Sequence, residues 1–423
     1  MRHKLLLSAA LILVLGSLGA AAHYAGSRPG APPPPAVSRD GKWRQDVEYF
    51  ARELPRLHAN AFHTLSRERF NEEVQRLLRD IPTLAEDAIR VRLAQLTASI
   101  GDGHTELDPV GNSARTLPLS VYWYSDGLFV TRVAPEYSRL AGSELLRIGD
   151  VPVTDAFQRV ATLISHDNAI RPLGVSPRLL VSPDVLHALG VVPSSDSATI
   201  LFRLRNGETT TVVLRAAVAR GMDRNAWVRA VPNPPLYRKY PDRAFWFAHL
   251  DNGHTLYVRY SDCRDPLEFW RFSREVARAL HDTAVRKVVV DFRANAGGNS
   301  FQFDHMLLNE LRNSADRASG RQMYEVTDRS TFSSATANAL SMHRETHALL
   351  IGEASGMKPN AYGEVRKFVL PNSRLTVWYA TKYIETDPAL KDAPTLVPDR
   401  PIQVSSREYL AGRDPVLEFI LEQ

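Results

Sequence analysis

The chain has 423 residues, of which 44% are hydrophobic and 23% are charged. This length and composition are typical of a soluble globular protein with two or three domains. The net charge is +5, but lysine and arginine are dispersed along the chain and form no basic block. Because a nucleic-acid-binding surface needs clustered basic residues, the sequence predicts no nucleic-acid partner.

Residues 1–22 have the pattern of a secretory signal. A basic start, Met1 to Lys4, precedes an apolar run that ends in three alanines at 20–22. The run is close to the roughly 20 residues that span a bilayer, so it also fits an uncleaved anchor. We expect export to the periplasm or the cell exterior, with either cleavage near Ala22 or a membrane tether through residues 5–22. Residues 23–42 include prolines at 32–35 and predict a semi-rigid linker.

A helical domain is predicted over residues 43–105. Its apolar residues recur at helical spacing, for example at Trp43, Val47, Phe50 and Leu54. The pattern stops at residues 101–105, Gly-Asp-Gly-His-Thr, where two glycines break the helix and expose a histidine on the turn. Taken alone, this turn favours a helix end that happens to carry a histidine over a catalytic base.

Residues 116–217 predict a β-rich subdomain. Short alternating strands are expected at 121–124, 128–133 and 198–204, and Asn-Gly at 206–207 predicts a hairpin turn before a strand at 210–214. Residues 165–193 interrupt this pattern and are interpreted as an insertion.

The remainder, residues 240–423, alternates between strand and helix patterns and predicts one α/β core. Strands are expected at 255–260, 287–292, 323–326, 348–351, 365–370 and 375–380, and helices at 267–280, 301–311 and 334–347. The apolar strand at 287–292 runs directly into a turn with paired glycines, Gly297 and Gly298. Glycines at this place expose backbone N–H groups at the carboxyl end of the strand.

A possible nucleophile follows about thirty residues later. Ser333 and Ser334 stand at the start of a predicted helix, where negative charge is favoured. A hydroxyl nucleophile beside free amides is what acyl transfer requires.

Other chemistries are less well supported. The single cysteine, Cys263, excludes an internal disulfide and is interpreted as a small packed side chain. His343 and His347 are one helical turn apart, but the glutamate between them lies on the opposite side of the helix, so we interpret the pair as surface residues. No metal or other cofactor is predicted.

Three segments together resemble the C-terminal-processing and tricorn-core serine peptidases. They are Asp-Phe-Arg-Ala-Asn-Ala-Gly-Gly at 291–298, Thr-Phe-Ser-Ser-Ala at 331–335 and Ile-Gly-Glu-Ala-Ser-Gly at 351–356. The order and spacing match the family, although Thr336 stands where the family often has glutamate. The resemblance implies a crotonase-like spiral core, an N-terminal helical domain and a PDZ-like subdomain that either clamps an extended peptide or is purely structural.

The resemblance also implies roles for single residues. It places the nucleophile at Ser333, with Ser334 as the alternative, and the oxyanion donors at the N–H groups of Gly297, Gly298 and Ser334. His104 is favoured as the general base because its unperturbed pKa is near neutrality. Lys358, the alternative, needs burial to lower its pKa by several units.

An acid that orients the histidine is expected late in the chain. Asp392 is preferred on the resemblance, and Glu385 is its rival. The predicted function is an exported serine endopeptidase that cleaves extended polypeptides through an acyl-enzyme with a Ser-His-acid mechanism. The alternatives are a Ser-Lys peptidase that uses Lys358, another acyl hydrolase, and a catalytically silent binding protein on the same scaffold. The sequence gives no oligomeric state.

Overall fold

The computed structural model describes residues 28–108, 115–218, 222–317 and 320–423. The predicted signal peptide or anchor, residues 1–22, lies outside these ranges. Among the described residues there is no helix with the length and apolar character needed to cross a membrane. The described part of the proline-rich segment packs against the next helix, since the Tyr49 hydroxyl donates a hydrogen bond of 2.8 Å to the Gly30 carbonyl.

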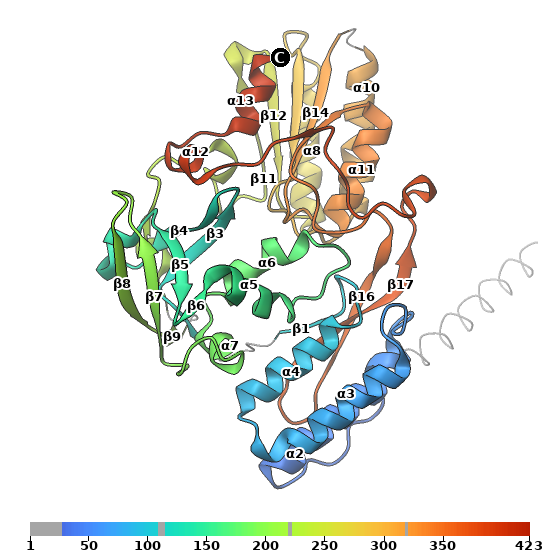
Figure 1. The fold of residues 1–423 in the computed structure, drawn as a ribbon. Coiled ribbons are helices and arrows are strands. Elements are labelled where there is room, and N and C mark those ends of the chain that lie inside the picture. The colour runs from blue at the N-terminus through green and yellow to red at the C-terminus, as the bar shows by residue number, and fades with distance from the viewer. Residues whose placement is uncertain (1–27, 109–114, 219–221, 318–319) are drawn as a thin grey trace, which may run out of the picture.

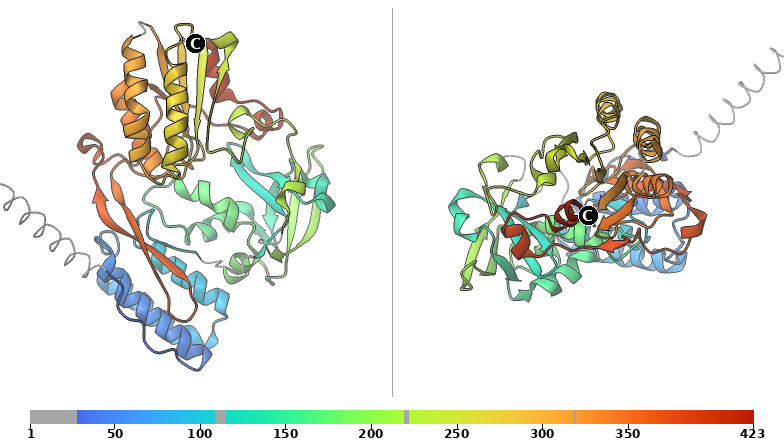
Figure 2. Two further views of the ribbon diagram at one scale, coloured as in Figure 1. Left: turned by 180° about the vertical axis from the view of Figure 1, so that it is seen from behind. Right: turned by 90° about the horizontal axis from the view of Figure 1, so that it is seen from above.

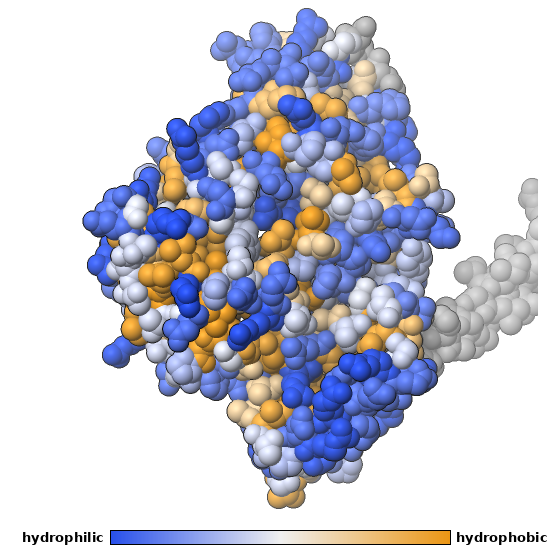
Figure 3. Space-filling view, viewed as in Figure 1, coloured by the Kyte–Doolittle hydropathy of each residue, from blue (hydrophilic) through white to orange (hydrophobic). Residues whose placement is uncertain are grey.

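Three helices form the lower part of the molecule in Figure 1, namely α2 (Arg39–Leu57), α3 (Arg67–Asp80) and α4 (Glu86–Ala98). Helix α2 starts inside the predicted linker because Ser38 caps it by accepting a hydrogen bond from the Gly41 amide. The apolar stripe that the sequence predicts, including Val47, Phe50 and Leu54, is buried. The opposite side is largely polar, as Figure 3 shows at the lower right of the molecule.

A second, β-rich part has the strand order β10-β4-β5-β7-β8, with β3 also paired to β4 and β6 to β5. Its elements are β3 (Leu119–Tyr124), β4 (Gly127–Val133), β5 (Glu144–Ile148), β6 (Val151–Pro152), α5 (Val153–Ala161), β7 (Ser197–Arg203), β8 (Thr209–Arg215) and β10 (Val228–Arg229). The hairpin between β7 and β8 turns at Gly207, whose φ is +89°. A turn of this kind needs positive φ, which glycine adopts without strain.

The predicted insertion, 165–193, contains α6 (Arg171–Leu179) and α7 (Pro183–Ala188). Helix α6 packs against β3 and α5, and the indole Nε1 of Trp123 donates a 3.1 Å hydrogen bond to the Ser176 hydroxyl. The insertion therefore fills space beside the sheet, between the β-rich part and the rest of the molecule (Figure 1).

The third part is an α/β layer whose sheet has the order β11-β12-β13-β14-β15-β18. Its strands are β11 (Phe245–Leu250), β12 (Thr255–Tyr260), β13 (Lys287–Asp291), β14 (Gln322–Thr327), β15 (Leu349–Gly352) and β18 (Arg400–Pro401). Strand β11 runs antiparallel to β12 and the other pairs are parallel. Helices α8 (Pro266–Ala279) and α11 (Ser334–Thr346) lie on one face of the sheet, and α13 (Pro415–Glu422) lies on the other (Figures 1 and 2).

Parts of the α/β layer differ from the sequence predictions. Strand β11 was not predicted, and the helix expected over 301–311 is divided at Leu307 into α9 (Phe301–Met306) and α10 (Leu308–Arg317). The chain bends between the two helices at Leu307, whose φ is −127° and whose side chain is buried. No glycine or proline marks this bend in the sequence.

The strands predicted at 365–370 and 375–380 leave the α/β layer. They form a long hairpin, β16 (Ala361–Val369) and β17 (Thr376–Ile384), which joins β1 (Glu106–Leu107) in a separate sheet of order β1-β17-β16. The hairpin runs down to the helices (Figure 2), where the buried Asp46 of α2 accepts hydrogen bonds from the amides of Asn372 and Ser373. The predicted core of 240–423 thus includes an arm that packs against the N-terminal helices.

Candidate active site

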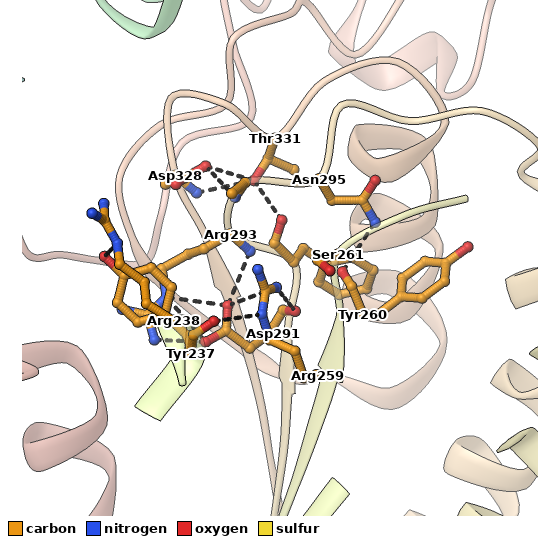
Figure 4. A network of polar contacts seen from close by, with 12 residues as sticks. Tyr237, Arg238, Arg259, Tyr260, Ser261, Asp291, Arg293, Asn295, Asp328 and Thr331 are labelled. Carbon is orange, nitrogen blue, oxygen red and sulfur yellow. Dashed lines mark hydrogen bonds and ion pairs between the residues drawn. The ribbon is translucent and has the colours of Figure 1, made fainter. Parts of the chain in front are cut away.

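The turn after β13 rests on a buried network of charged side chains (Figure 4). The Arg293 guanidinium donates to both carboxylate oxygens of Asp414, at 2.9 and 2.8 Å, and also to Asp291. Burial alone would raise the pKa of Asp291, but Arg293 and Arg259 outweigh it and hold the pKa below its ordinary value. Because each buried charge has an opposite partner, the network fixes the start of the glycine turn.

Ser333 sits at a sharp bend before α11. It is the N-cap residue of that helix, and its backbone has φ +54° and ψ −129°. A non-glycine residue in this region is strained, and such strain is found mainly at functional sites. The bend is held in place because the Phe332 amide donates a 3.0 Å hydrogen bond to the Asn295 carbonyl in the glycine turn.

The His104 turn is held by two other elements. Asp102 accepts hydrogen bonds from the amides of His104 and Thr105, both at 2.8 Å, through one carboxylate oxygen. Its other oxygen lies 2.8 Å from Nε2 of the buried His58, the C-cap residue of α2. From the arm, the Ala380 amide of β17 donates to the Thr105 hydroxyl at 3.2 Å. The turn is therefore fixed between the helical part and the arm.

The fold brings His104 and Ser333 together across 229 positions of sequence, with 2.8 Å between His104 Nε2 and Ser333 Oγ. Both side chains line a cavity of about 920 Å³, together with Gly297, Gly298 and the arm residue Tyr362. This distance is within the range of a hydrogen bond between a nucleophile and its base.

His104 is buried, and its surroundings favour the neutral imidazole. Burial, followed by the positive charge of Arg171, lowers the pKa of His104 to about 4, while Asp102 and the backbone of Tyr362 act in the opposite direction. Its ring lies against Phe332, with 4.6 Å between the ring centroids, and the Arg171 guanidinium covers the same phenyl ring at 3.5 Å. A neutral imidazole is the form that accepts a proton.

Backbone amides near Ser333 are available for an anion. Among the described residues, the N–H groups of Gly298 and Ser334 donate to no protein acceptor. The Gly297 N–H, in contrast, donates a 2.9 Å hydrogen bond to the side chain of Asn295. The prediction of Gly297 as an oxyanion donor therefore does not agree with the structure, whereas the positions of Gly298 and Ser334 fit that role.

The remaining predicted residues lie elsewhere. The Ser334 hydroxyl donates to the Gly298 carbonyl at 2.8 Å and not to His104. Lys358 is half-buried, makes no hydrogen bond to Ser333, and its amide donates to Asp167 at 3.2 Å. Asp392 and Glu385 are exposed and lie near Tyr383.

Neither Asp392 nor Glu385 orients His104 in the structure. The Nδ1 atom of His104 is buried and has no hydrogen-bond acceptor among the described residues, although the backbone of Tyr362 is near enough to affect the pKa of the ring. The predicted acid is misplaced because the loop that carries Asp392 follows the arm to the surface. Sequence reasoning missed Asp102, the carboxylate that holds the turn, and Arg171, although Asp102 stands two residues before His104.

Cys263 is buried against the glycine turn, as the sequence predicts for a packed thiol. Burial raises its pKa to about 11, so the thiol stays protonated. His343 is half-buried beside Glu325, and His347 is exposed. Within the described ranges no group of three or more histidine, cysteine, aspartate or glutamate side chains is arranged to hold a metal ion.

Comparisons with known proteins define the fold. No family model matches the sequence, and no curated protein matches it. Matching solved structures include the photosystem II D1 C-terminal processing protease, with 14% identity, a TM-score of 0.38, and coverage of 90% of this chain and 99% of that one.

Two structures of mature CPAF resemble the chain more strongly. One has 13% identity, a TM-score of 0.60, and coverage of 90% of this chain and 96% of that one. The other, a complex with lactacystin, has 13% identity, a TM-score of 0.59, and coverage of 90% and 97%. The chain therefore shares the fold of the CPAF structures over nearly its whole length.

Proposed function

We propose that the protein is an exported serine endopeptidase that hydrolyses extended polypeptides through an acyl-enzyme. The observation that carries the proposal is the 2.8 Å contact between His104 Nε2 and the hydroxyl of a strained Ser333, beside two amides with no protein acceptor. The shared fold with CPAF and the motif resemblance support the same reaction class. Export rests on the sequence of residues 1–22 alone.

The proposed reaction follows from these positions. Ser333 Oγ attacks the peptide carbonyl while its proton passes to His104 Nε2, and the resulting oxyanion accepts hydrogen bonds from Gly298 and Ser334. His104 then gives the proton to the leaving amine, and water releases the acyl group by the same route. Asp102 acts as a positioning residue, since it binds the backbone of the turn and not the imidazole ring.

A Ser-Lys mechanism is less well supported because Lys358 makes no hydrogen bond to Ser333. The catalytically silent binding protein is favoured by one observation, the missing acceptor at His104 Nδ1. In the peptidase proposal, the Nδ1 proton of His104 points toward the backbone of Tyr362 in the arm. That backbone contributes to the pKa of His104.

The two finer assignments of fold are proposals as well. We propose a crotonase-like core for the α/β layer and a PDZ-like arrangement for the sheet that contains β3 to β8. Because α6 packs against β3, this subdomain is proposed to be structural and not a peptide clamp at that strand.

The test is release of peptides from an unfolded protein substrate, detected by mass spectrometry, with Ser333→Ala as control. Wild type is expected to cut internal bonds, and Ser333→Ala is expected to lose activity by a factor on the order of 10⁴ or more. Hydrolysis of a simple ester without any peptide cleavage would instead indicate another acyl hydrolase. No turnover of either substrate would favour the silent binding protein.

A further inference from the structure

A second cavity of about 500 Å³ adjoins the one at Ser333. The two cavities share the lining residues Ser261, Asp262 and Ala294, which border the turn after β13. We call the second one the arginine cavity because its wall includes Arg132, Arg229, Arg238, Arg243 and Arg259. The shared residues place the arginine cavity next to the cavity at Ser333.

Arg238 is the unusual member of this set. Its guanidinium lies near three tyrosine rings, at 4.9 Å from the ring centre of Tyr122, 5.1 Å from Tyr237 and 5.4 Å from Tyr409. Among the described residues its one hydrogen bond runs from Nε to the Tyr237 hydroxyl at 2.9 Å, and it has no carboxylate partner. A half-buried guanidinium normally has an anionic partner.

The charges around Arg238 do not supply that partner. Arg293 is neutralised by Asp291 and Asp414, and Arg259 lies 3.7 Å from Asp291. The carboxylate of Asp262 is already paired with Arg264 at 2.6 Å. The exposed Asp242 is the other carboxylate on the wall.

The other arginines add like charge. Within the described part of the chain, Arg132, Arg229 and Arg243 form no ion pair. Burial, followed by the charges of Arg229 and Arg224, lowers the pKa of Arg132, and its Nε is buried without an acceptor. The cavity is thus an electropositive site with unused donors and aromatic walls.

We propose that the arginine cavity binds a carboxylate of the polypeptide substrate, with Arg238 as its principal ligand. A guanidinium fork matches a carboxylate in geometry, and low-dielectric tyrosine walls strengthen the attraction. This inference rests on the proposed function, because the cavity shares part of its wall with the cavity at Ser333, and it adds a substrate class: polypeptides with an acidic group within reach of the scissile bond.

The test measures binding separately from cleavage. Two series of fluorescent twelve-residue peptides are made from alanine and serine, with an amidated C-terminus. Each peptide carries a single Glu in one series, or a single Gln in the other, and the position of that residue changes from peptide to peptide. They are titrated into the Ser333→Ala protein, which leaves them intact, and the Gln peptides are repeated with a free C-terminal carboxylate. We expect Glu at a subset of positions, or the free terminus, to tighten binding about tenfold, and less at high salt.

Replacing arginines of the cavity by glutamine tests whether the arginine cavity is the site that binds the carboxylate. In the Ser333→Ala background, Arg238→Gln is expected to abolish the tenfold preference, while the matched control Arg274→Gln, on the exposed side of α8, retains it. Arg229→Gln, at an exposed position of the wall, is the second variant in case Arg238→Gln unfolds, and is expected to weaken the preference at least threefold.

Equal binding of Glu and Gln peptides at every position, with no gain from a free terminus, would overturn the proposal, as would no binding of any peptide. A preference that survives in both cavity variants would also overturn it. Because these measurements use the inactive variant, a failure of the peptidase proposal shows separately, as absence of cleavage by the wild-type protein.

Discussion

His104 is neutral in this structure because of what surrounds its ring. Burial first, and then Arg171, depress its pKa from 6.5 to about 4. Since the base must be unprotonated, kcat/KM is expected to stay high as pH falls below 6.5 and to decline only toward pH 4. Measurement of kcat/KM from pH 3.5 to 8 checks this. A half-maximal value at or above pH 6.5 would contradict it.

Arg171 offers a direct test of that cause. Arg171→Gln removes a positive charge that disfavours the imidazolium, so the acidic limb of the pH profile is expected to move to higher pH. Arg178→Gln is the matched control, because it lies on the same helix with a side chain that is 62% exposed. A profile that is unchanged in Arg171→Gln, or shifted equally in both variants, would exclude this role.

Gly297 is needed for the close approach of the two turns. Its φ is +91°, and a Cβ there would lie 2.6 Å from Ser333 Cβ and 2.8 Å from the Phe332 carbonyl oxygen. Gly297→Ala is expected to lower kcat roughly a hundredfold by displacing the nucleophile. Gly207→Ala shares the positive φ, +89°, but meets nothing within 4 Å, so it is expected to lose stability and to keep activity.

At the scale of elements, strand β14 carries a buried acid with no hydrogen bond. Glu325 is fully buried, and burial raises its pKa to about 7. His343 Nδ1 is 3.3 Å away but directs its hydrogen bond to the Ala348 carbonyl at 3.0 Å. Between pH 4.5 and 7 the unfolded chain releases this proton while the folded protein keeps it, so stability falls as pH rises.

Glu325→Gln removes that dependence. We expect it to raise the free energy of unfolding by up to about 3 kcal/mol at pH 8 and by little at pH 5. Urea denaturation at both pH values measures the difference. A variant that is less stable than wild type at pH 8 would show that the carboxylate has an ionic partner there.

The arm is the element that sequence patterns describe least well. Its two strands were predicted near their observed positions, but no local pattern indicated that they would pair with β1, beside His104, and leave the α/β layer. For the same reason the loop after the arm, with Asp392, was placed wrongly at the histidine. Pairing between segments about 270 residues apart leaves no signal in the spacing of either one.

Asp46 tests whether the arm controls the site. Asp46→Ala leaves the Asn372 and Ser373 amides without their buried acceptor, so the arm is expected to loosen and kcat/KM to fall about tenfold, with a smaller loss of global stability. Glu48→Ala, an exposed change on the same helix, is the control. Proteolysis of the native protein within 361–384 would report the loosening, and unchanged cleavage and activity would contradict it.

For the whole molecule, the sequence predicted the order of a helical part, a β-rich part and an α/β part, because periodicity and turn residues are local signals. It also selected His104 and Ser333, the two residues that the fold brings to 2.8 Å, through the family resemblance and through motifs at the end of one predicted helix and the start of another. The sequence did not predict features that depend on contacts between residues far apart in the chain. Examples are the packing of Arg171 against Phe332 and the enclosure of Arg238 by tyrosines.

The central claim is that His104 activates Ser333. Labelling by a fluorophosphonate probe tests it most directly, with the modified residue located by mass spectrometry in wild type, Ser333→Ala, His104→Ala and Lys358→Ala. The account predicts that wild type and Lys358→Ala label on Ser333 at similar rates, and that His104→Ala labels at least a hundredfold more slowly. Labelling of His104→Ala at the wild-type rate, with loss of labelling in Lys358→Ala, would contradict it.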